Sequence, residues 1–229
     1  MLPQCRAFPP RHDAEHGRVT ARWWHIVLGA ALAAALIAIG GAGAAILGLG
    51  GTENPTVESV DAGFSRDMST HHRQAVLMAG LARDRSTDPE IALIAYDIES
   101  TQLNQVGRMQ GWLSLWDLAQ STGEQMAWME GSGGMDMSGS GSGSMPGMAT
   151  ADDLDELRAA LGTDFDVLFL QLMIRHHQGG AEMATYAAEH AEVASVRTLA
   201  RSIADSQAAE VDTLTNMLTA RGGIPLPAP

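Results

Sequence analysis

Residues 64–78 read FSRDMSTHHRQAVLM, and residues 169–183 read FLQLMIRHHQGGAEM. Both stretches hold a phenylalanine, two methionines and an adjacent histidine pair at identical spacing, and the offset between them is 105 residues. The same offset relates apolar positions further along, from Ala95 and Ala200 to Leu113 and Leu218. A register that persists through a turn between two helical patterns indicates a duplicated structural unit.

Each unit has the pattern of a helical hairpin. In the first unit the apolar period predicts helices over 61–83 and 89–120, with Asp88 as the N-cap and Pro89 at the first helical position. In the second unit we expect helices over 163–190, capped by Thr163, and over 193–221, ended by Gly222 and Gly223. No strand pattern is visible. The predicted fold class is all-α, a four-helix bundle built from two duplicated helical hairpins.

A Gly/Ser-rich stretch at 131–148 separates the two units. It is too poor in apolar residues to pack a core, so we expect it to be flexible. A short helix over 151–161, capped by Thr150, follows it. A connection of this length lets the third bundle helix run antiparallel to the first, and the two histidine pairs would then approach each other.

An apolar stretch near the N-terminus predicts a transmembrane helix ahead of the bundle. Residues 26–51 contain no charged side chain and are long enough to cross about 30 Å of hydrocarbon. Four arginines before this stretch favour a cytoplasmic N-terminus and an extracytoplasmic body. A cleaved signal peptide, with a small-residue site at residues 42–44, is the alternative and would give a secreted protein. Small residues at Gly40, Ala44 and Gly48 would allow two anchors to pack as a homodimer.

The chain therefore divides into six segments. They are a basic cytoplasmic segment (1–24), the anchor or signal peptide (25–51), the first hairpin repeat (52–120), a Met/Gly/Ser-rich linker (121–150), the second hairpin repeat (151–221) and a tail (222–229).

Charge and cysteine content exclude several classes of function. The net charge is −13, and residues after 22 carry ten arginines against 25 acids, so this body would repel nucleic acid. The one cysteine, Cys5, supports no disulfide framework and no cysteine-based metal site. No Ser/His/Asp set, phosphate-binding loop or nucleotide fingerprint is visible, so no catalytic constellation predicts an enzyme.

The doubled motif predicts a metal site. At 100° per residue, each first helix presents imidazole and thioether groups on one face. Imidazole binds many transition metals, whereas thioether selects soft ions, above all Cu(I). One isolated methionine or histidine on such a face is most often core, but the paired motif at identical spacing favours metal ligands. The candidate ligands are Met68, His71, His72, Met78, Met173, His176, His177 and Met183. Which histidine of each pair faces the site stays open.

Two further sets of residues have a place in this hypothesis. Gln102 and Gln207 occupy equivalent positions on the second helices, where each would accept a ring N–H from a ligating histidine or would face water at the bundle edge. Met135 and Met137 are accessory ligands that would capture Cu(I) in the linker and pass it to the bundle. Met145, Met148, Met126 and Met129 belong to the same methionine-rich region. A linker that has merely drifted towards methionine is the alternative.

The motif Met-x2-His-His-x2-Ala-x2-Met, at Met68 to Met78, resembles the bacterial family called domain of unknown function 305. The resemblance covers about 58–120 and 163–221, although Gly180 replaces the alanine in the second motif and should loosen that helix by about 1 kcal/mol. It implies a ferritin-like bundle, exported or attached to the membrane, and a role in copper binding and copper tolerance.

The sequence therefore predicts a membrane-anchored, extracytoplasmic copper-binding protein for tolerance, storage or handover of copper to a delivery partner. A di-iron ferritin-like oxidoreductase is one alternative, but it needs Glu-x2-His motifs that neither repeat has. A b-type haem bundle and a metal-free exported interaction module are the others.

Overall fold

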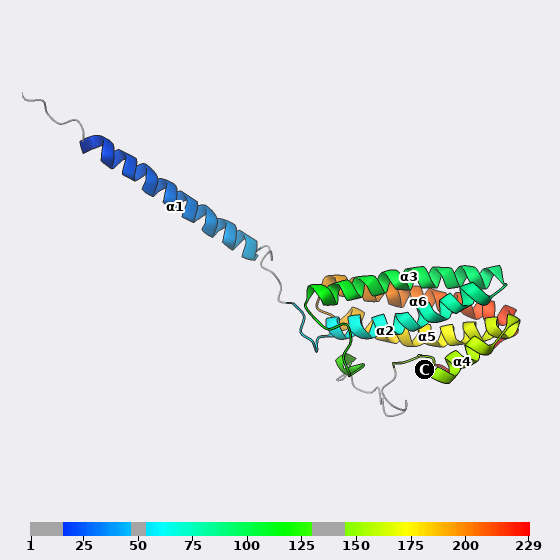
Figure 1. Cartoon of the computed structure of the whole chain (residues 1–229). Helices are drawn as coiled ribbons and strands as arrows, with labels where there is room; N and C mark the ends of the chain where they lie inside the picture. The colour runs from blue at the N-terminus through cyan, green and yellow to red at the C-terminus, as the bar shows by residue number, and fades with distance from the viewer. Residues whose placement is uncertain (1–15, 47–53, 130–144) are drawn as a thin grey trace, which may run out of the picture. The chain divides into compact units, whose positions relative to one another are not determined.

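The computed structural model describes residues 16–46, 54–129 and 145–229 and forms two compact units, Met1–Glu53 and Asn54–Pro229 (Figure 1). Met135 and Met137, the two accessory ligands, lie outside the described residues. Two further parts of the chain also lie outside the described residues: Gly48, one of the three small residues that would let two anchors pack, and residues 1–15 of the basic segment.

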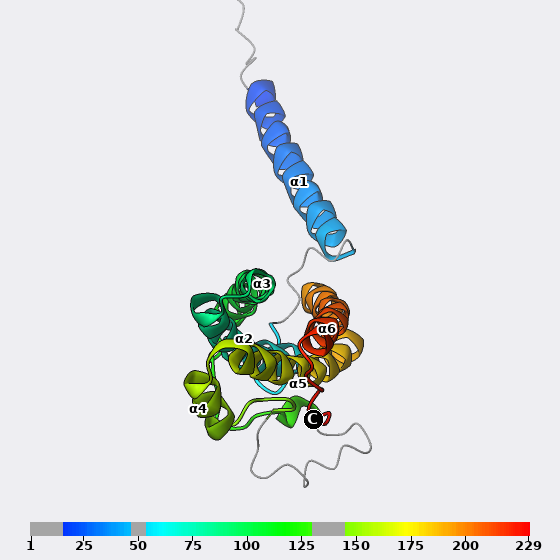
Figure 2. The same ribbon diagram turned by 90° about the vertical axis from the view of Figure 1, so that its right-hand side faces the viewer.

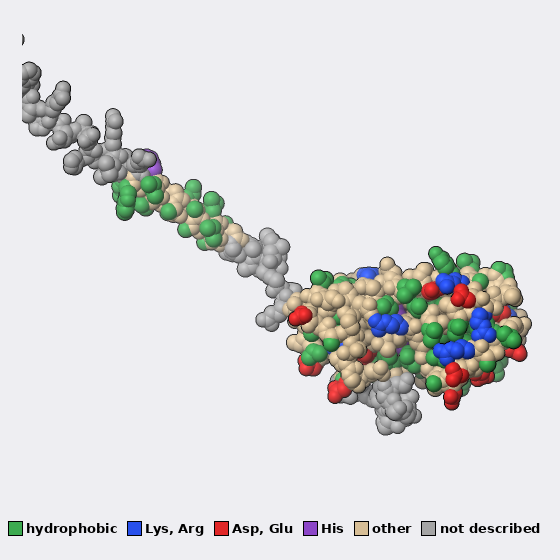
Figure 3. All heavy atoms as spheres, in the orientation of Figure 1, with side chains coloured by type: hydrophobic (Ala, Val, Ile, Leu, Met, Phe, Trp, Pro, Cys, Tyr) green, Lys and Arg blue, Asp and Glu red, His purple; other side chains and the backbone are tan. Residues whose placement is uncertain are grey.

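The N-terminal unit contains one apolar helix, α1 (His16–Ile46). Its stretch Trp23–Gly40 has a mean hydropathy of 1.9, and none of this stretch is buried. Figure 3 shows hydrophobic side chains along this helix. Length and composition fit a signal peptide or a membrane anchor, as the sequence predicts.

The second unit is all-α in its described residues. Its long helices are α2 (Val60–Arg85), α3 (Pro89–Leu115), α5 (Gly162–His190) and α6 (Ala194–Ala220), with a short α4 (Ala151–Ala159) and a 3-10 turn η1 (Ala127–Met129). α2 pairs with α3 and α5 pairs with α6, and contact between α2 and α5 joins the two hairpins. The view along the helices in Figure 2 shows α3 and α6 on the same side of the α2–α5 pair. The predicted four-helix bundle of duplicated hairpins is confirmed.

α2 and α5 run antiparallel, as the sequence predicts. At one end, the Asp61 carboxylate near the start of α2 accepts hydrogen bonds from the backbone N–H groups of Glu192 (3.0 Å) and Val193 (2.8 Å), just after α5. At the other end, the Arg85 guanidinium lies 5.2 Å from the Phe165 ring centre. The middles of the two helices, which hold the histidine pairs, therefore meet.

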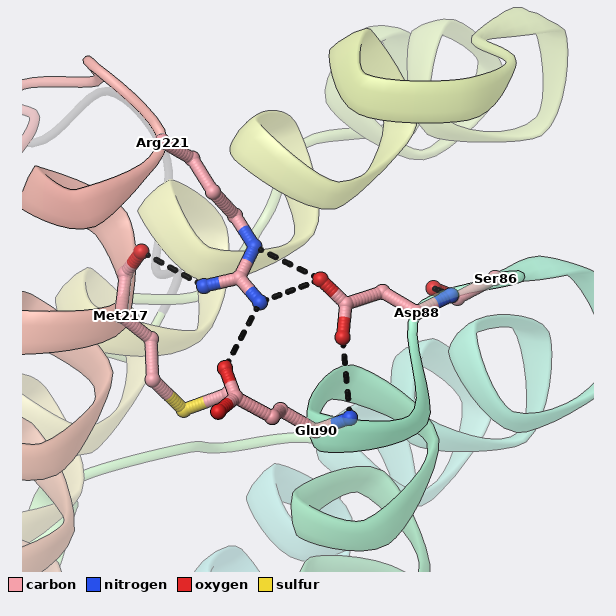
Figure 4. Close-up of polar contacts among 5 residues, drawn as sticks. All are labelled: Ser86, Asp88, Glu90, Met217 and Arg221. Atoms are coloured by element: carbon pink, nitrogen blue, oxygen red, sulfur yellow. Dashed lines mark hydrogen bonds and ion pairs between the residues drawn. The ribbon is translucent and has the colours of Figure 1, made fainter.

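Arg221 ties the end of α6 to the start of α3 (Figure 4). Its guanidinium donates to the Asp88 carboxylate, to Glu90 Oε2 at 3.1 Å and to the Met217 carbonyl at 2.8 Å. Asp88 is also the N-cap of α3, as predicted, and accepts from the Glu90 N–H at 2.9 Å. The hydrogen bond from Arg221 lowers the pKa of the Asp88 carboxyl below its usual range. One arginine thus connects the two hairpins away from the α2–α5 contact.

Two predicted helix ends are wrong. α3 ends at Leu115 instead of residue 120, because Asp117 adopts a positive φ of 58° and the Leu118 N–H returns to the Leu113 carbonyl at 2.9 Å. This is a Schellman ending, in which the residue with positive φ is usually glycine. Because aspartate occupies that position here, the sequence does not reveal the helix end. α5 begins at Gly162, so Thr163 is not its N-cap; Leu161 holds that position without a side-chain hydrogen bond.

Two other predicted ends, the stop of α6 and the start of α4, are confirmed, whereas α4 ends at Ala159 instead of residue 161 and α2 ends at Arg85 instead of residue 83. α6 closes through Gly222, whose φ is +72°, with the Gly223 N–H on the Leu218 carbonyl at 3.1 Å. α4 begins with a capping box in which the Thr150 hydroxyl accepts from the Asp153 N–H and the Asp153 carboxylate accepts from the Thr150 N–H.

The described residues at both ends of the methionine-rich linker, 121–129 and 145–150, pack on the bundle, and the burial of Met145 corrects the expectation of no core packing for the described part of 131–148. The Asp67 carboxylate accepts from the Met126 N–H (2.7 Å) and from Trp128 Nε1 (2.8 Å). Trp128 lies directly on Gly63, where a Cβ would come within 2.3 Å of the indole. Met145, at the other end, is 3% exposed. The prediction failed because these contacts depend on distant residues of α2 and not on local composition.

Candidate metal centre

The two histidine pairs meet at the centre of the bundle. His71 on α2 and His176 on α5 face each other, with ring centres 3.8 Å apart and planes inclined by 36°. His177 lies next to this pair, with its ring centre 6.3 Å from that of His176. All four histidine side chains, including His72, are completely buried. Helical spacing explains this placement, because both motifs sit at the crossing of the antiparallel helices.

The Nε2 atom of each imidazole has one hydrogen-bond partner. His71 Nε2 lies 3.0 Å from the Pro146 carbonyl, and His176 Nε2 lies 3.1 Å from the carbonyl of His71 itself. His72 and His177, which we call the outer histidines, contact side chains of the neighbouring helices. His72 Nε2 lies 2.7 Å from Gln105 Oε1 on α3, and His177 Nε2 lies 2.6 Å from Glu210 Oε2 on α6.

These partners determine which ring nitrogen carries the proton. Backbone carbonyls and carboxylates only accept hydrogen bonds, and the Gln105 oxygen also accepts, so Nε2–H is the donor in all four rings. Nδ1 then holds the free lone pair of each neutral imidazole. In the described part of the chain, the Nδ1 atoms of His71, His72, His176 and His177 are buried and have no hydrogen-bond partner. Buried polar atoms without partners are rare and costly, and four of them in one place make this cluster a candidate binding site.

Burial also keeps these imidazoles neutral. Loss of solvation lowers the pKa of His71 to about 4 and that of His72 to about 3. The pKa of His176 falls well below its ordinary value, first because of burial and then because of the neighbouring imidazoles. At neutral pH no proton competes for the Nδ1 lone pairs of these three rings, so they are ready to act as ligands.

Thioether groups lie at both sides of the imidazole cluster. Met68 and Met183 belong to one buried apolar cluster, and Met78 and Met173 belong to the other. All four side chains are completely buried. The antiparallel crossing of α2 and α5 produces this pairing. Met68, which precedes the first histidine pair, lies in the same cluster as Met183, which follows the second pair. Met173 and Met78 are related in the same way. The eight predicted ligands thus occupy the core of the bundle, around the α2–α5 contact.

Sequence reasoning missed the residues that orient the outer histidines. It named Gln102 and Gln207, whereas Gln105 and Glu210 make these hydrogen bonds, three residues further along each helix. Gln105 and Glu210 are related by the 105-residue offset, and that relation was the available signal. Gln102 and Gln207 do not face water: they are 3% and 2% exposed, and no partner for either amide is present among the described residues.

The glycine of the second motif allows Gln207 and His71 to come close together. A Cβ at Gly180 would lie 2.6 Å from Gln207 Oε1 and 3.0 Å from His71 Cε1. The sequence predicted only a looser helix at this position. The structure shows that the missing side chain makes room for a buried amide beside the central imidazole.

The donor set suits a soft ion. Among the described residues, no three side chains of His, Cys, Asp or Glu form a candidate metal group. Besides the imidazoles, the buried donors include the sulfur atoms of four methionines and the amide oxygens of Gln102 and Gln207, which have no partner among the described residues. Imidazole with thioether fits Cu(I), whereas Zn²⁺ takes imidazole, thiolate and carboxylate.

Fold and site together define a class of protein, an all-α bundle of duplicated hairpins with a buried cluster of imidazoles and thioethers at its centre. The chain belongs to the DUF305 family, a domain of unknown function whose family model matches residues 61–218.

Solved structures agree with this membership. A DUF305 protein of Streptomyces coelicolor is 41% identical, with a TM-score of 0.68 over 75% of this chain and 99% of that one. A DUF305 fragment of Deinococcus radiodurans is 27% identical, with a TM-score of 0.58 over 72% and 97% of the two chains. CopM, solved in a Cu(I)-bound form, is 25% identical, with a TM-score of 0.54 over 71% and 98%. No match was found among curated proteins.

Proposed function

We propose that this chain binds copper outside the cytoplasm, preferentially as Cu(I), for copper tolerance, storage or handover. The observation that carries the proposal is the set of four buried Nδ1 atoms without partners, in rings whose Nε2–H groups are already held. Metal-ligating histidines characteristically donate their second N–H to such a partner, which fixes the ring and strengthens the ligand. The ligands we propose are the eight residues of the doubled motif.

The thioethers supply the selectivity. Cu(I) prefers soft donors and needs no net negative charge on its ligands. Met68, Met78, Met173 and Met183 lie in a core that excludes water. The similarity to CopM, solved in a Cu(I)-bound form, supports the same metal for this chain.

The proposed place of action is the outer face of the cytoplasmic membrane. α1 would act as a single-pass anchor, with the four arginines before Trp23 inside and the bundle outside. Signal cleavage would give a secreted bundle instead. Mass spectrometry of the mature protein from its membrane fraction distinguishes the two, because only the anchor retains the stretch Trp23–Gly40.

The linker would collect copper for the bundle. Met135 and Met137 supply thioethers on a tether attached to the bundle at both ends, which would keep captured ions at millimolar effective concentration. Replacing both residues by serine should slow Cu(I) loading in stopped-flow measurements and leave the final occupancy nearly unchanged. Identical loading traces would remove the linker from the proposal.

A metal titration of the 54–229 unit tests the proposed function. Purified under reducing conditions, it should bind Cu(I) in preference to Zn²⁺ and should not retain iron. His71→Ala combined with His176→Ala should abolish high-affinity binding, whereas His190→Ala, which removes an exposed histidine, should not. Tighter zinc binding or an iron-loaded protein would overturn the copper assignment, and a protein that binds none of these metals would favour an interaction module.

A further inference from the structure

The end of the linker is fastened across the two central helices. The Gln74 side-chain amide on α2 donates to the Ala149 carbonyl at 2.9 Å and accepts from the Ala149 N–H at 2.7 Å. Both backbone groups of Ala149 are thus bound by one side chain. Met145, four residues earlier, is buried in the apolar cluster that contains Met68 and Met183. We call residues 145–149 the strap.

Two glycines allow the strap to lie directly on α5. A Cβ at Gly179 would come within 2.1 Å of the Pro146 carbonyl oxygen. Gly147 has a φ of +75°, and a Cβ there would come within 2.4 Å of the Arg175 carbonyl oxygen. Any side chain at position 179 would therefore push the Pro146 carbonyl away from the helix.

This close approach brings the Pro146 carbonyl to His71. The oxygen lies 3.0 Å from His71 Nε2. The equivalent His176 uses the backbone carbonyl of His71 itself, which belongs to the duplicated helices. His71 is therefore the one ring of the four whose acceptor comes from the linker, and the strap has no counterpart in the other hairpin.

We propose that the strap is a positioning element of the metal centre: its Pro146 carbonyl holds His71 with the proton on Nε2, so that Nδ1 stays free for the metal. The proposal rests on the proposed copper function. An imidazole without this acceptor can exchange tautomers, because its Nδ1–H and Nε2–H forms are then no longer distinguished by a fixed partner. Loss of such a partner typically weakens metal binding by 10- to 100-fold.

Gly179→Ala tests the proposal, with Gly80→Ala as its matched control. Both changes replace a helical glycine by alanine, but a Cβ at Gly80 meets no atom within 4 Å. Ag(I), a soft monovalent ion that does not change oxidation state, is the metal probe. The first measurement needs no metal: the long-range proton–nitrogen NMR spectrum of the histidine rings reports the tautomer of His71. The second is the dissociation constant for Ag(I).

In the full 54–229 unit, Gly179→Ala should shift His71 away from a pure Nε2–H tautomer and weaken Ag(I) binding by at least tenfold, while His177 keeps its tautomer. Gln74→Leu, which releases Ala149 without touching α5, should give the same two changes and serves if Gly179→Ala does not fold. Gly80→Ala should give neither. Unchanged His71 tautomer and affinity in both strap variants would overturn the proposal. A wild-type protein that binds no Ag(I) would overturn the proposed function, and the tautomer would still decide the role of the strap.

Discussion

Glu210 and Gln105 occupy equivalent positions in the two hairpins, but one is a carboxylate and the other an amide. A carboxylate that accepts from His177 Nε2 makes Nδ1 of that ring a stronger ligand than an amide does. We predict that Glu210→Gln, which retains an acceptor oxygen and removes the charge, weakens Cu(I) binding by about tenfold. Competition with a chromogenic Cu(I) chelator measures the effect. Glu182→Gln, at an exposed position of α5, is the control; equal affinities for both variants would contradict the assigned role.

The buried imidazoles predict a pH dependence of stability in the metal-free protein. The pKa of His71 is lowered to about 4 and that of His72 to about 3, so below pH 6.5 the unfolded chain binds protons that the folded chain does not. The free energy of unfolding should be highest above pH 6.5. It should fall between pH 6 and 4 by about 1.4 kcal/mol per pH unit for each such histidine.

Urea unfolding at a series of pH values measures this slope. His72→Leu should reduce it by the share of one histidine, and His190→Ala, at an exposed position, should leave it unchanged. A stability independent of pH over this window would show that the rings are not buried in the neutral form.

At the residue scale, sequence reasoning identified the candidate ligand side chains and missed what orients the histidines. The paired histidines and methionines are visible because duplication repeats them at identical spacing. Gln105 and Glu210 were missed because only the actual rotation of α3 and α6 decides which glutamine or glutamate reaches a ring. Pro146 was missed because its contribution is a backbone carbonyl, which has no sequence signature.

At the element scale, the two hairpins differ in how their second helices end. Asp117 and Gly222 are related by the 105-residue offset, and both adopt a positive φ, 58° and 72°. Glycine has no steric penalty in this conformation, whereas aspartate has one. We predict that Asp117→Gly raises the free energy of unfolding by about 0.5–1 kcal/mol and that Gly222→Asp lowers it similarly. Urea unfolding of both variants decides this, and a change of the same sign in both would contradict the argument.

Helix positions were largely predictable from local patterns, and helix ends were predictable only where the usual residue was present. Asp88, Thr150 and Gly222 gave correct starts and a correct stop. α3 stops before the predicted residue 120, and this end was not predicted because Asp117 occupies the position that glycine normally takes. α5 starts at Gly162 with no side-chain cap, so no local signal marked that end.

At the scale of the whole molecule, metal binding should stabilise the fold. A ligand that binds the folded state alone adds about 2.7 kcal/mol when present at 100 times its Kd. We predict that Cu(I) raises the melting temperature of the 54–229 unit. His71→Ala with His176→Ala should abolish the rise while the metal-free bundle stays folded, as circular dichroism would show. A full response in the double variant would mean that these histidines are not ligands.

The antiparallel meeting of α2 and α5 was predictable from the duplication, since two equivalent hairpins with a long connection form a symmetric pair. The linker contacts were not predictable. Trp128 packs on Gly63 and Gln74 binds Ala149 across 65 and 75 residues of sequence, and these contacts depend on the assembled bundle. The strap, which breaks the symmetry of the two hairpins, therefore appears only in the structure.

The most direct test of the central claim is the long-range proton–nitrogen NMR spectrum of the 54–229 unit, recorded without metal and with one equivalent of Ag(I). Without metal, His71, His72, His176 and His177 should all show protonated Nε2 and unprotonated Nδ1. With Ag(I), the Nδ1 resonances of His71 and His176 should shift while their Nε2–H protons remain. Nδ1–H tautomers in the metal-free protein, or loss of the Nε2–H protons on metal binding, would contradict the account.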